Sequence, residues 1–202
     1  ATQRRLIGAA ETLFAERGID AVSLREINAA SGMGNATALQ YHFRDRDGLL
    51  RAVLAKHHTS IEVQRHRLLD ECVHSATGDV RALAGALVRP EADKLADADG
   101  GRAYLRINAQ LFNRTGKMPE SRSAKRSINR WRAMVAPLLS EDAVQRLHHR
   151  YAAIRFSATE LGRRAAEPAR RDDRLFVANL VDLVAALLSA PVSAETEALL
   201  RQ

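Results

Sequence analysis

Cysteine is almost absent from this sequence, because the 202 residues include only one, Cys72. A single thiol cannot form an intramolecular disulfide, and it excludes a zinc cluster built from several cysteines. Aromatic residues make up 4% of the chain, and proline occurs five times. Alanine, leucine and arginine dominate instead, and such side chains lose little rotamer freedom in a helix. These features predict an all-α fold and exclude a β-sandwich or a β-barrel.

The sequence also lacks a long uninterrupted apolar run. Its most apolar stretch, residues 175–192, contains Asn179 and Asp182, which favours a buried or interface helix over a membrane span. The N-terminus has the pattern of an amphipathic helix with charges throughout, which is unlike a signal peptide. We therefore expect a cytoplasmic protein with no membrane partner.

Acidic residues are fewer than basic ones, with 24 Asp and Glu against 31 Lys and Arg, so the formal net charge is +7. A positive balance points to a polyanionic partner, most often nucleic acid. Residues 1–56 hold eight of the basic and six of the acidic residues, a surplus of only two. The role of this region therefore has to be argued from its motif.

The first fifty residues predict three helices. Apolar residues at helical spacing predict a helix over residues 2–17. Ser23 and Glu26 have the spacing of a capping box, which opens a short helix. The glycine-containing turn 31–34 ends that helix, and Asn35 begins another that runs to His42. Two short helices joined by a glycine turn predict a helix-turn-helix unit.

The rest of the chain predicts a helical body. A long helix follows from residue 45 to about 72, and shorter ones are expected over 80–88, over 104–112 and from Pro119 onward. Residues 140–166 and 175–188 predict two further helices, and a short one is expected after Ser193. In total we expect about nine helices, arranged as a helix-turn-helix head over residues 1–47 and an effector-binding and dimerisation body over residues 48–202.

The second helix of the pair is suited to reading DNA in the major groove. A reading helix needs small or polar outward residues, so that its backbone can approach the bases. Leu39 and Phe43 are expected to face the core. Asn and Gln pair with adenine and the methyls of Thr and Ala contact thymine, whereas Tyr, His and Arg suit phosphates. The DNA-contacting residues predicted in and around the helix pair are Arg25, Asn35, Ala36, Thr37, Gln40, Tyr41, His42, Arg44 and Arg46.

These segments, taken in order, resemble the TetR-type transcriptional repressors. The resemblance rests on residues 9–18, 22–27, 30–33, 39–43 and 47–50, about the first quarter of the chain. The stretch from Asn35 to Phe43 matches a variant of the family pattern in which the tyrosine directly precedes the histidine. Arg46 stands where the family usually has a lysine, which keeps the positive charge.

The resemblance implies a homodimer that forms through the last long helices and binds a palindromic operator in double-stranded DNA. The helix at 175–188 is apolar on nearly all sides, and a two-fold four-helix bundle would cover it. An alternative is that this helix is simply central in the monomer. The predicted interface residues are Tyr151, Ile154, Ala158, Leu161, Phe176, Leu180, Leu183, Val184 and Leu187.

The resemblance also implies that an unknown small-molecule effector binds the body and releases the DNA. The residues predicted to line its pocket are Tyr104, Asn108, Phe112, Trp131 and Met134, although ordinary core packing is an alternative role for each. Adjacent histidines at 57–58 and 148–149 point in different directions on a helix, so we expect no metal site. No nucleophile or nucleotide loop stands out, so we expect no cofactor and no enzyme.

Three functions are therefore open: an effector-released repressor, which the pattern favours; a ligand-independent or activating regulator; and a helical ligand-binding protein or enzyme without a role on DNA.

Overall fold

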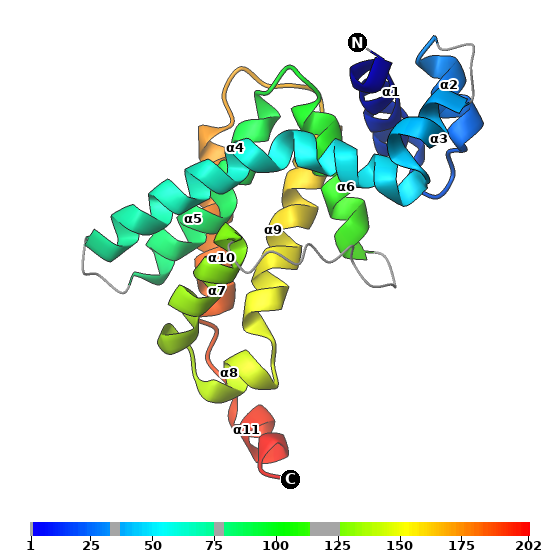
Figure 1. Ribbon diagram of the computed structural model, residues 1–202. Coiled ribbons are helices and arrows are strands. Elements are labelled where there is room, and N and C mark those ends of the chain that lie inside the picture. Colours follow the sequence, from blue (N-terminus) through cyan, green and yellow to red (C-terminus); the bar gives the residue numbers. More distant parts are fainter. Residues whose placement is uncertain (1, 33–36, 75–78, 114–125) are drawn as a thin grey trace. The chain divides into compact units, whose positions relative to one another are not determined.

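The computed structural model describes residues 2–32, 37–74, 79–113 and 126–202 (Figure 1). These residues form helices and connecting loops and include no strand, which confirms the predicted all-α fold. The described part contains eleven α-helices and two short 3₁₀ helices, against about nine helices expected. The helices are α1 (Thr2–Arg17), α2 (Leu24–Ala30), α3 (Thr37–Phe43), α4 (Arg46–His74), α5 (Val80–Ala92), η1 (Asp93–Leu95), α6 (Gly101–Asn113), α7 (Ser127–Val135), η2 (Ala136–Leu138), α8 (Glu141–Gln145), α9 (His149–Ala166), α10 (Arg174–Leu188) and α11 (Ala194–Leu200).

The chain divides into two compact units that interleave along the sequence. Unit 1 comprises residues 1–61, 93–121 and 158–169, and unit 2 comprises the remainder. Helices α4 and α9 contribute one part to each unit. Unit 1 therefore combines the predicted head with α6, while the functional division at residue 47 stays a prediction.

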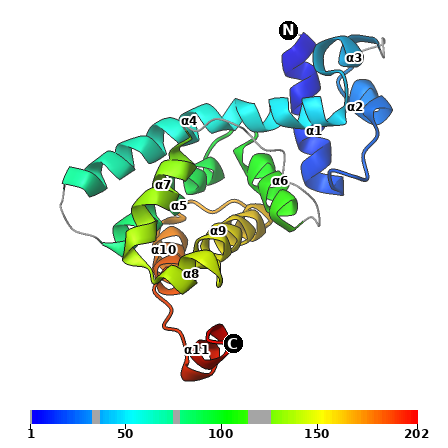
Figure 2. The same ribbon diagram turned by 60° about the horizontal axis from the view of Figure 1, so that its bottom comes forward.

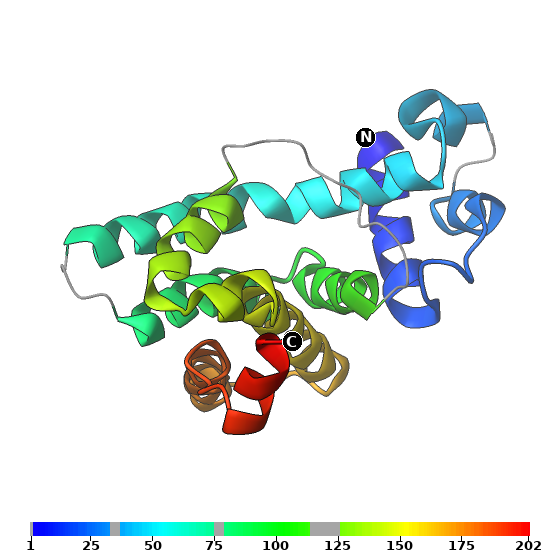
Figure 3. The same cartoon turned by 90° about the horizontal axis from the view of Figure 1, so that it is seen from below.

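Unit 1 is built around α1. This helix packs against α2 and α6, and Leu6 and Phe14 on its inner face are fully buried, as are Ile27 of α2 and Val53 of α4. Figures 2 and 3 show the three N-terminal helices grouped at the first turns of α4. Helices α1 to α4 all bury apolar side chains in this unit. The short α2 and α3 are therefore stabilised by tertiary packing rather than by their own length.

Unit 1 also buries a carboxylate, that of Glu11 on α1. Its Oε1 lies 2.5 Å from Nε2 of the buried His57, and its Oε2 accepts a hydrogen bond of 2.8 Å from Lys56 Nζ. Lys56 also donates to Asp99 Oδ1 at 2.7 Å. Partial burial lowers the pKa of Lys56, but the hydrogen bonds to Asp99 and Glu11 outweigh it and raise the pKa above its usual value. This cluster joins α1, α4 and the loop that precedes α6.

Unit 2 is held together by α5, which packs along α10 and against α7 (Figure 2). Residues 83–88 of α5 are all buried. Trp131 of α7 is also fully buried, and its Nε1 donates a hydrogen bond of 2.7 Å to the carbonyl oxygen of Leu83. Pro90 lies inside α5, and the helix continues to Ala92.

The expectation of one long helix over residues 140–166 was wrong. Ser140 caps α8, because its Oγ accepts from the amide of Ala143, but the helix ends at Gln145. His148 then takes a left-handed φ of 55°, and α9 begins at the next residue. Arg150 in the first turn of α9 donates to the carbonyl oxygen of Arg132 in α7 at 3.1 Å. No glycine or proline marks this break in the sequence.

We predict that Gly100→Ala destabilises unit 1 by about 2–4 kcal/mol, because residue 100 has little room for a side chain. Its φ is +81°, which favours glycine, and an added Cβ would overlap the Glu11 carboxylate. Gly8→Ala is the matched control, since nothing lies within 4 Å of a Cβ there. This substitution should raise the free energy of unfolding by about 0.5–1 kcal/mol, because Gly8 is inside α1 and alanine favours a helix more than glycine does. Urea unfolding followed by circular dichroism measures both. Equal midpoints for the two variants would contradict this account of the cluster.

Candidate DNA-reading site and body surfaces

The first helix of the predicted pair is positioned by its own N-terminus. Ser23 Oγ accepts from the amide of Glu26 at 3.2 Å, and Glu26 Oε2 accepts from the amide of Ser23 at 2.8 Å, which confirms the predicted capping box. Arg17 Nη2 lies 2.8 Å from Glu26 Oε1. Hydrogen bonds from the hydroxyl and amide of Ser23, and then from Arg17, lower the pKa of Glu26 to about 2. Glu26 therefore stays ionised in this cap at neutral pH.

The second helix, α3, has one buried and one exposed side. Leu39 and Phe43 are buried, as the sequence predicts. Gln40, Tyr41 and His42 are exposed, and 83% of the Tyr41 surface is accessible. The rings of Tyr41 and His42 meet edge to face, with centroids 5.2 Å apart. The exposed side of α3 therefore presents three adjacent side chains that can form hydrogen bonds.

Three of the predicted DNA contacts have side chains outside the residues that the structure describes. Asn35 and Ala36 are outside the described residues, and Thr37 is the first residue of α3, with its side chain also outside them. Their assigned roles in base recognition remain predictions.

The basic residues predicted at the edge of the site have different surroundings. Arg25 in α2 and Arg44 after α3 are both exposed, and neither has a carboxylate partner among the residues that the structure describes. Arg44 has a φ of 64°, unusual for a residue with a side chain, and its amide donates to the carbonyl oxygen of Gln40 at 3.0 Å. Arg46 instead donates from Nη1 to the carbonyl oxygen of Asp20 at 3.2 Å. Arg46 thus fixes the start of α4 to the link between α1 and α2.

The predicted effector-pocket residues lie on two helices that belong to different units, α6 in unit 1 and α7 in unit 2. Tyr104 is buried, with its ring 4.7 Å from that of His57. Trp131 is buried and hydrogen-bonded, whereas Asn108, Phe112 and Met134 are half-buried. Their role in binding an effector stays a prediction.

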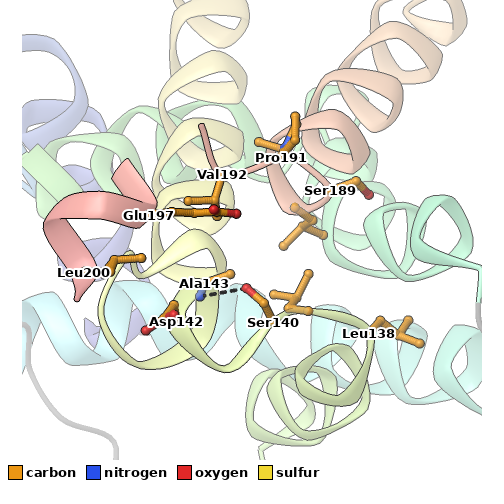
Figure 4. Close-up of a pocket in the computed structure, with 12 residues that line it drawn as sticks. Leu138, Ser140, Asp142, Ala143, Ser189, Pro191, Val192, Glu197 and Leu200 are labelled. Atoms are coloured by element: carbon orange, nitrogen blue, oxygen red, sulfur yellow. Dashed lines mark hydrogen bonds between the residues drawn. The ribbon is translucent and has the colours of Figure 1, made fainter. Parts of the chain in front are cut away.

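The described surface includes a hollow in each unit. The first is a groove of about 660 Å³ in unit 1, between the link that follows α1, the end of α6 and the second half of α9. The second, in unit 2, measures about 440 Å³ and is bounded by α8, the end of α10 and α11 (Figure 4). Leucine, proline and valine side chains line it beside the carboxylates of Asp142 and Glu197. The five predicted pocket residues line neither hollow.

The predicted interface residues differ in their exposure. Tyr151 of α9 and Leu183 of α10 are exposed, Phe176 and Leu187 are half-buried, and the other five are buried within the chain: Ile154, Ala158, Leu161, Leu180 and Val184. Leu175, which is not among the predicted interface residues, is 85% exposed at the start of α10. Large apolar side chains therefore remain uncovered on α10.

Two further findings concern metal ions and membranes. Within the described residues, no group of three or more His, Cys, Asp or Glu side chains is placed to hold a metal ion. In the same part of the chain, no helix combines the length and the apolar character that a bilayer crossing requires.

Comparison with known proteins adds the family. No curated protein sequence matches the chain. Two crystal structures of RolR, one in complex with the ligand resorcinol and one without ligand, align with TM-scores of 0.40. They share 20% and 17% sequence identity with the chain, covering 95% and 93% of it and 95% and 97% of RolR.

Residues 6–53 match the family described as bacterial regulatory proteins, tetR family. The match spans most of α1, all of α2 and α3 and the first turns of α4, so it covers the capping box, the exposed side of α3, Arg25 and Arg44. Residues 6–53 therefore carry the helix-turn-helix DNA-binding domain of the tetR family.

Proposed function

We propose that the chain is a cytoplasmic repressor that binds a palindromic operator as a homodimer and leaves it when a small molecule binds the body. The observation that carries the proposal is the exposed side of α3. Gln40, Tyr41 and His42 face solvent there, while Leu39 and Phe43 anchor the helix to the core. This arrangement supports insertion of α3 into the major groove, because its outward residues can hydrogen-bond without disturbing the fold.

Each DNA contact follows from the chemistry of its side chain. Gln40, with Asn35, is assigned to adenine edges, and Ala36 and Thr37 to thymine methyls. Tyr41, His42, Arg25 and Arg44 are assigned to phosphates at the groove edge. Arg46 uses Nη1 for carbonyl oxygens, but a guanidinium has five N–H donors, so a phosphate contact from the same side chain remains compatible. The list of proposed contacts is therefore the one that the sequence predicts.

Dimerisation is supported by the exposed apolar residues of α10. Leu183 is 43% exposed, and Leu175 is exposed on the same helix. Half-buried Phe176 and Leu187 extend this apolar area, and the exposed Tyr151 of α9 adds an aromatic ring in unit 2. The buried Leu180 and Val184 support the face from inside the chain. A second copy would remove these side chains from water and bring two reading heads to two half-sites.

Release by an effector requires that the effector prefer the form that does not bind DNA, since equal affinity for both forms shifts nothing. The proposed pocket remains the set Tyr104, Asn108, Phe112, Trp131 and Met134. A regulator that ignores small molecules, or one that activates, would bind the same operator but would show no effector-induced release. The proposal includes no catalysed reaction.

A footprint on the DNA that flanks the chain's own gene tests the repressor. With excess non-specific competitor and at two salt concentrations, we expect a protected, roughly two-fold symmetric site. Gln40→Ala should weaken binding to that site by about 5–150-fold, which corresponds to about 1–3 kcal/mol for a bidentate base contact. Gln145→Ala, which truncates another exposed glutamine, on α8, is the control and should bind normally. Protection that disappears with competitor at both salt concentrations would contradict sequence-specific binding.

Arg44→Gly should have opposite effects on stability and on DNA binding. Glycine removes the strain of the left-handed backbone, so we expect the free energy of unfolding to rise by about 0.5–1 kcal/mol. Loss of a phosphate contact should make the slope of log K against log salt less negative by about 0.9. Arg44→Lys, which keeps the charge and the strain, should change neither quantity. An Arg44→Gly protein with an unchanged salt slope would remove Arg44 from the proposed contacts.

Leu183→Glu should convert the dimer into a monomer, because it places a charge in the centre of the proposed interface. We expect sedimentation equilibrium to give a dissociation constant at least 100-fold higher, with an unchanged circular dichroism spectrum. Leu199→Glu introduces the same charge at an exposed leucine of α11 and is the control. If both variants have the mass of the unmodified protein, this face of α10 is not the interface.

A further inference from the structure

The N-terminal turn of α1 lies against the turn of the helix-turn-helix. A Cβ atom on Gly32 would lie 2.6 Å from Nη2 of Arg5, so the guanidinium occupies the space that a side chain there would fill. Gly32 follows α2 with a φ of +67°, a left-handed conformation that favours glycine. The absence of a side chain at residue 32 thus lets a basic group from α1 approach the backbone between α2 and α3.

The basic side chains of residues 1–56 divide into two groups. One group is engaged within unit 1: Arg17 pairs with Glu26, Arg46 donates to Asp20 and Lys56 binds Glu11. The other group is exposed and has no carboxylate partner among the residues that the structure describes; its members are Arg4, Arg5, Arg25, Arg44 and Arg51. Sequence reasoning assigned Arg25 and Arg44 to DNA and missed Arg5, because its relation to the turn spans 27 residues of sequence.

The position of Arg5 beside this turn suits a phosphate rather than a base. A reading helix contacts base edges with its N-terminal residues, and the chain that leads into it therefore runs beside the phosphates at the groove edge. Arg5 belongs to α1 and borders that chain at Gly32. A guanidinium matches the geometry of a phosphate with two parallel N–H donors, and it stays charged at every physiological pH.

We propose that Arg5 binds a phosphate of the DNA backbone beside the helix-turn-helix turn, so that the DNA contacts extend from α3 to the first turn of α1. The proposal rests on the DNA-binding function of the family and names one further contact of the same site. It assigns the contact to the backbone, so Arg5 adds affinity for any duplex and no sequence preference.

The test uses a 30-base-pair duplex of arbitrary sequence, labelled with a fluorophore and titrated with the full chain between 50 and 200 mM KCl. For Arg5→Gln we expect weaker binding, and a slope of log K against log salt that is less negative by about 0.9 for the lost phosphate contact. Arg5→Lys keeps the charge and should retain most of the slope. Arg17→Gln is the matched control, because Arg17 lies on the same helix about 18 Å away and is held by Glu26.

The outcomes separate this inference from the function on which it rests. If the unmodified chain fails to bind the duplex at low salt, DNA binding itself is lost and the inference with it. If the unmodified chain binds with a steep salt slope and Arg5→Gln has the same slope, Arg5 makes no phosphate contact while DNA binding stands. If Arg17→Gln lowers the slope as much as Arg5→Gln does, the effect is one of net charge, and the assignment to Arg5 is wrong.

Discussion

Unit 1 depends on the burial of one carboxylate, that of Glu11. A carboxylate removed from water is stable only with close partners, and His57 and Lys56 supply them at 2.5 and 2.8 Å. Both partners lie on α4, and the backbone at Gly100 covers the carboxylate from the loop before α6. A single side chain of α1 therefore fixes the positions of α4 and of this loop, and with them the base on which α2 and α3 rest.

Burial and pairing also decide which charges the head can offer to DNA. Counted from the sequence, residues 1–56 have a surplus of only two positive charges. In the structure, however, Glu11 is buried with its partners, and Glu26 is engaged by its cap and by Arg17. The arginines left without carboxylate partners among the described residues include Arg5, beside the turn between α2 and α3, and Arg44, directly after α3. Pairing removes two acidic and two basic side chains and so leaves the surplus at two, which means that the contribution to DNA binding comes from where the unpaired arginines lie rather than from the net charge.

Local features of the head could be predicted from the sequence, whereas its long-range contacts could not. The Ser23–Glu26 capping box and the inward Leu39 and Phe43 follow from spacings of three and four residues, so the sequence contains all their determinants. Glu11 sits in an amphipathic helix where a charged residue is normally exposed, and its partner His57 is 46 residues away. The break before α9 likewise has no glycine or proline to mark it, although His148 takes a left-handed φ of 55° there. The fold class and the reading helix could therefore be predicted from the sequence, whereas the contacts between distant helices could not.

The same contacts limit how the head can respond if an effector releases the protein from DNA. Gln110 of α6 accepts a hydrogen bond from the amide of Ile19 and donates one to the carbonyl oxygen of Phe14, so α6 holds the end of α1 as well. Separating α1 from α6 would break these two hydrogen bonds, at about 1 kcal/mol each, and would expose the side chains packed between the two helices. Moving a two-state equilibrium from 1:99 to 99:1 takes only about 5.5 kcal/mol of differential affinity. Separation would use up part of that differential affinity, so we expect α1 and α6 to move together, and α2, which packs against α1, to move with them.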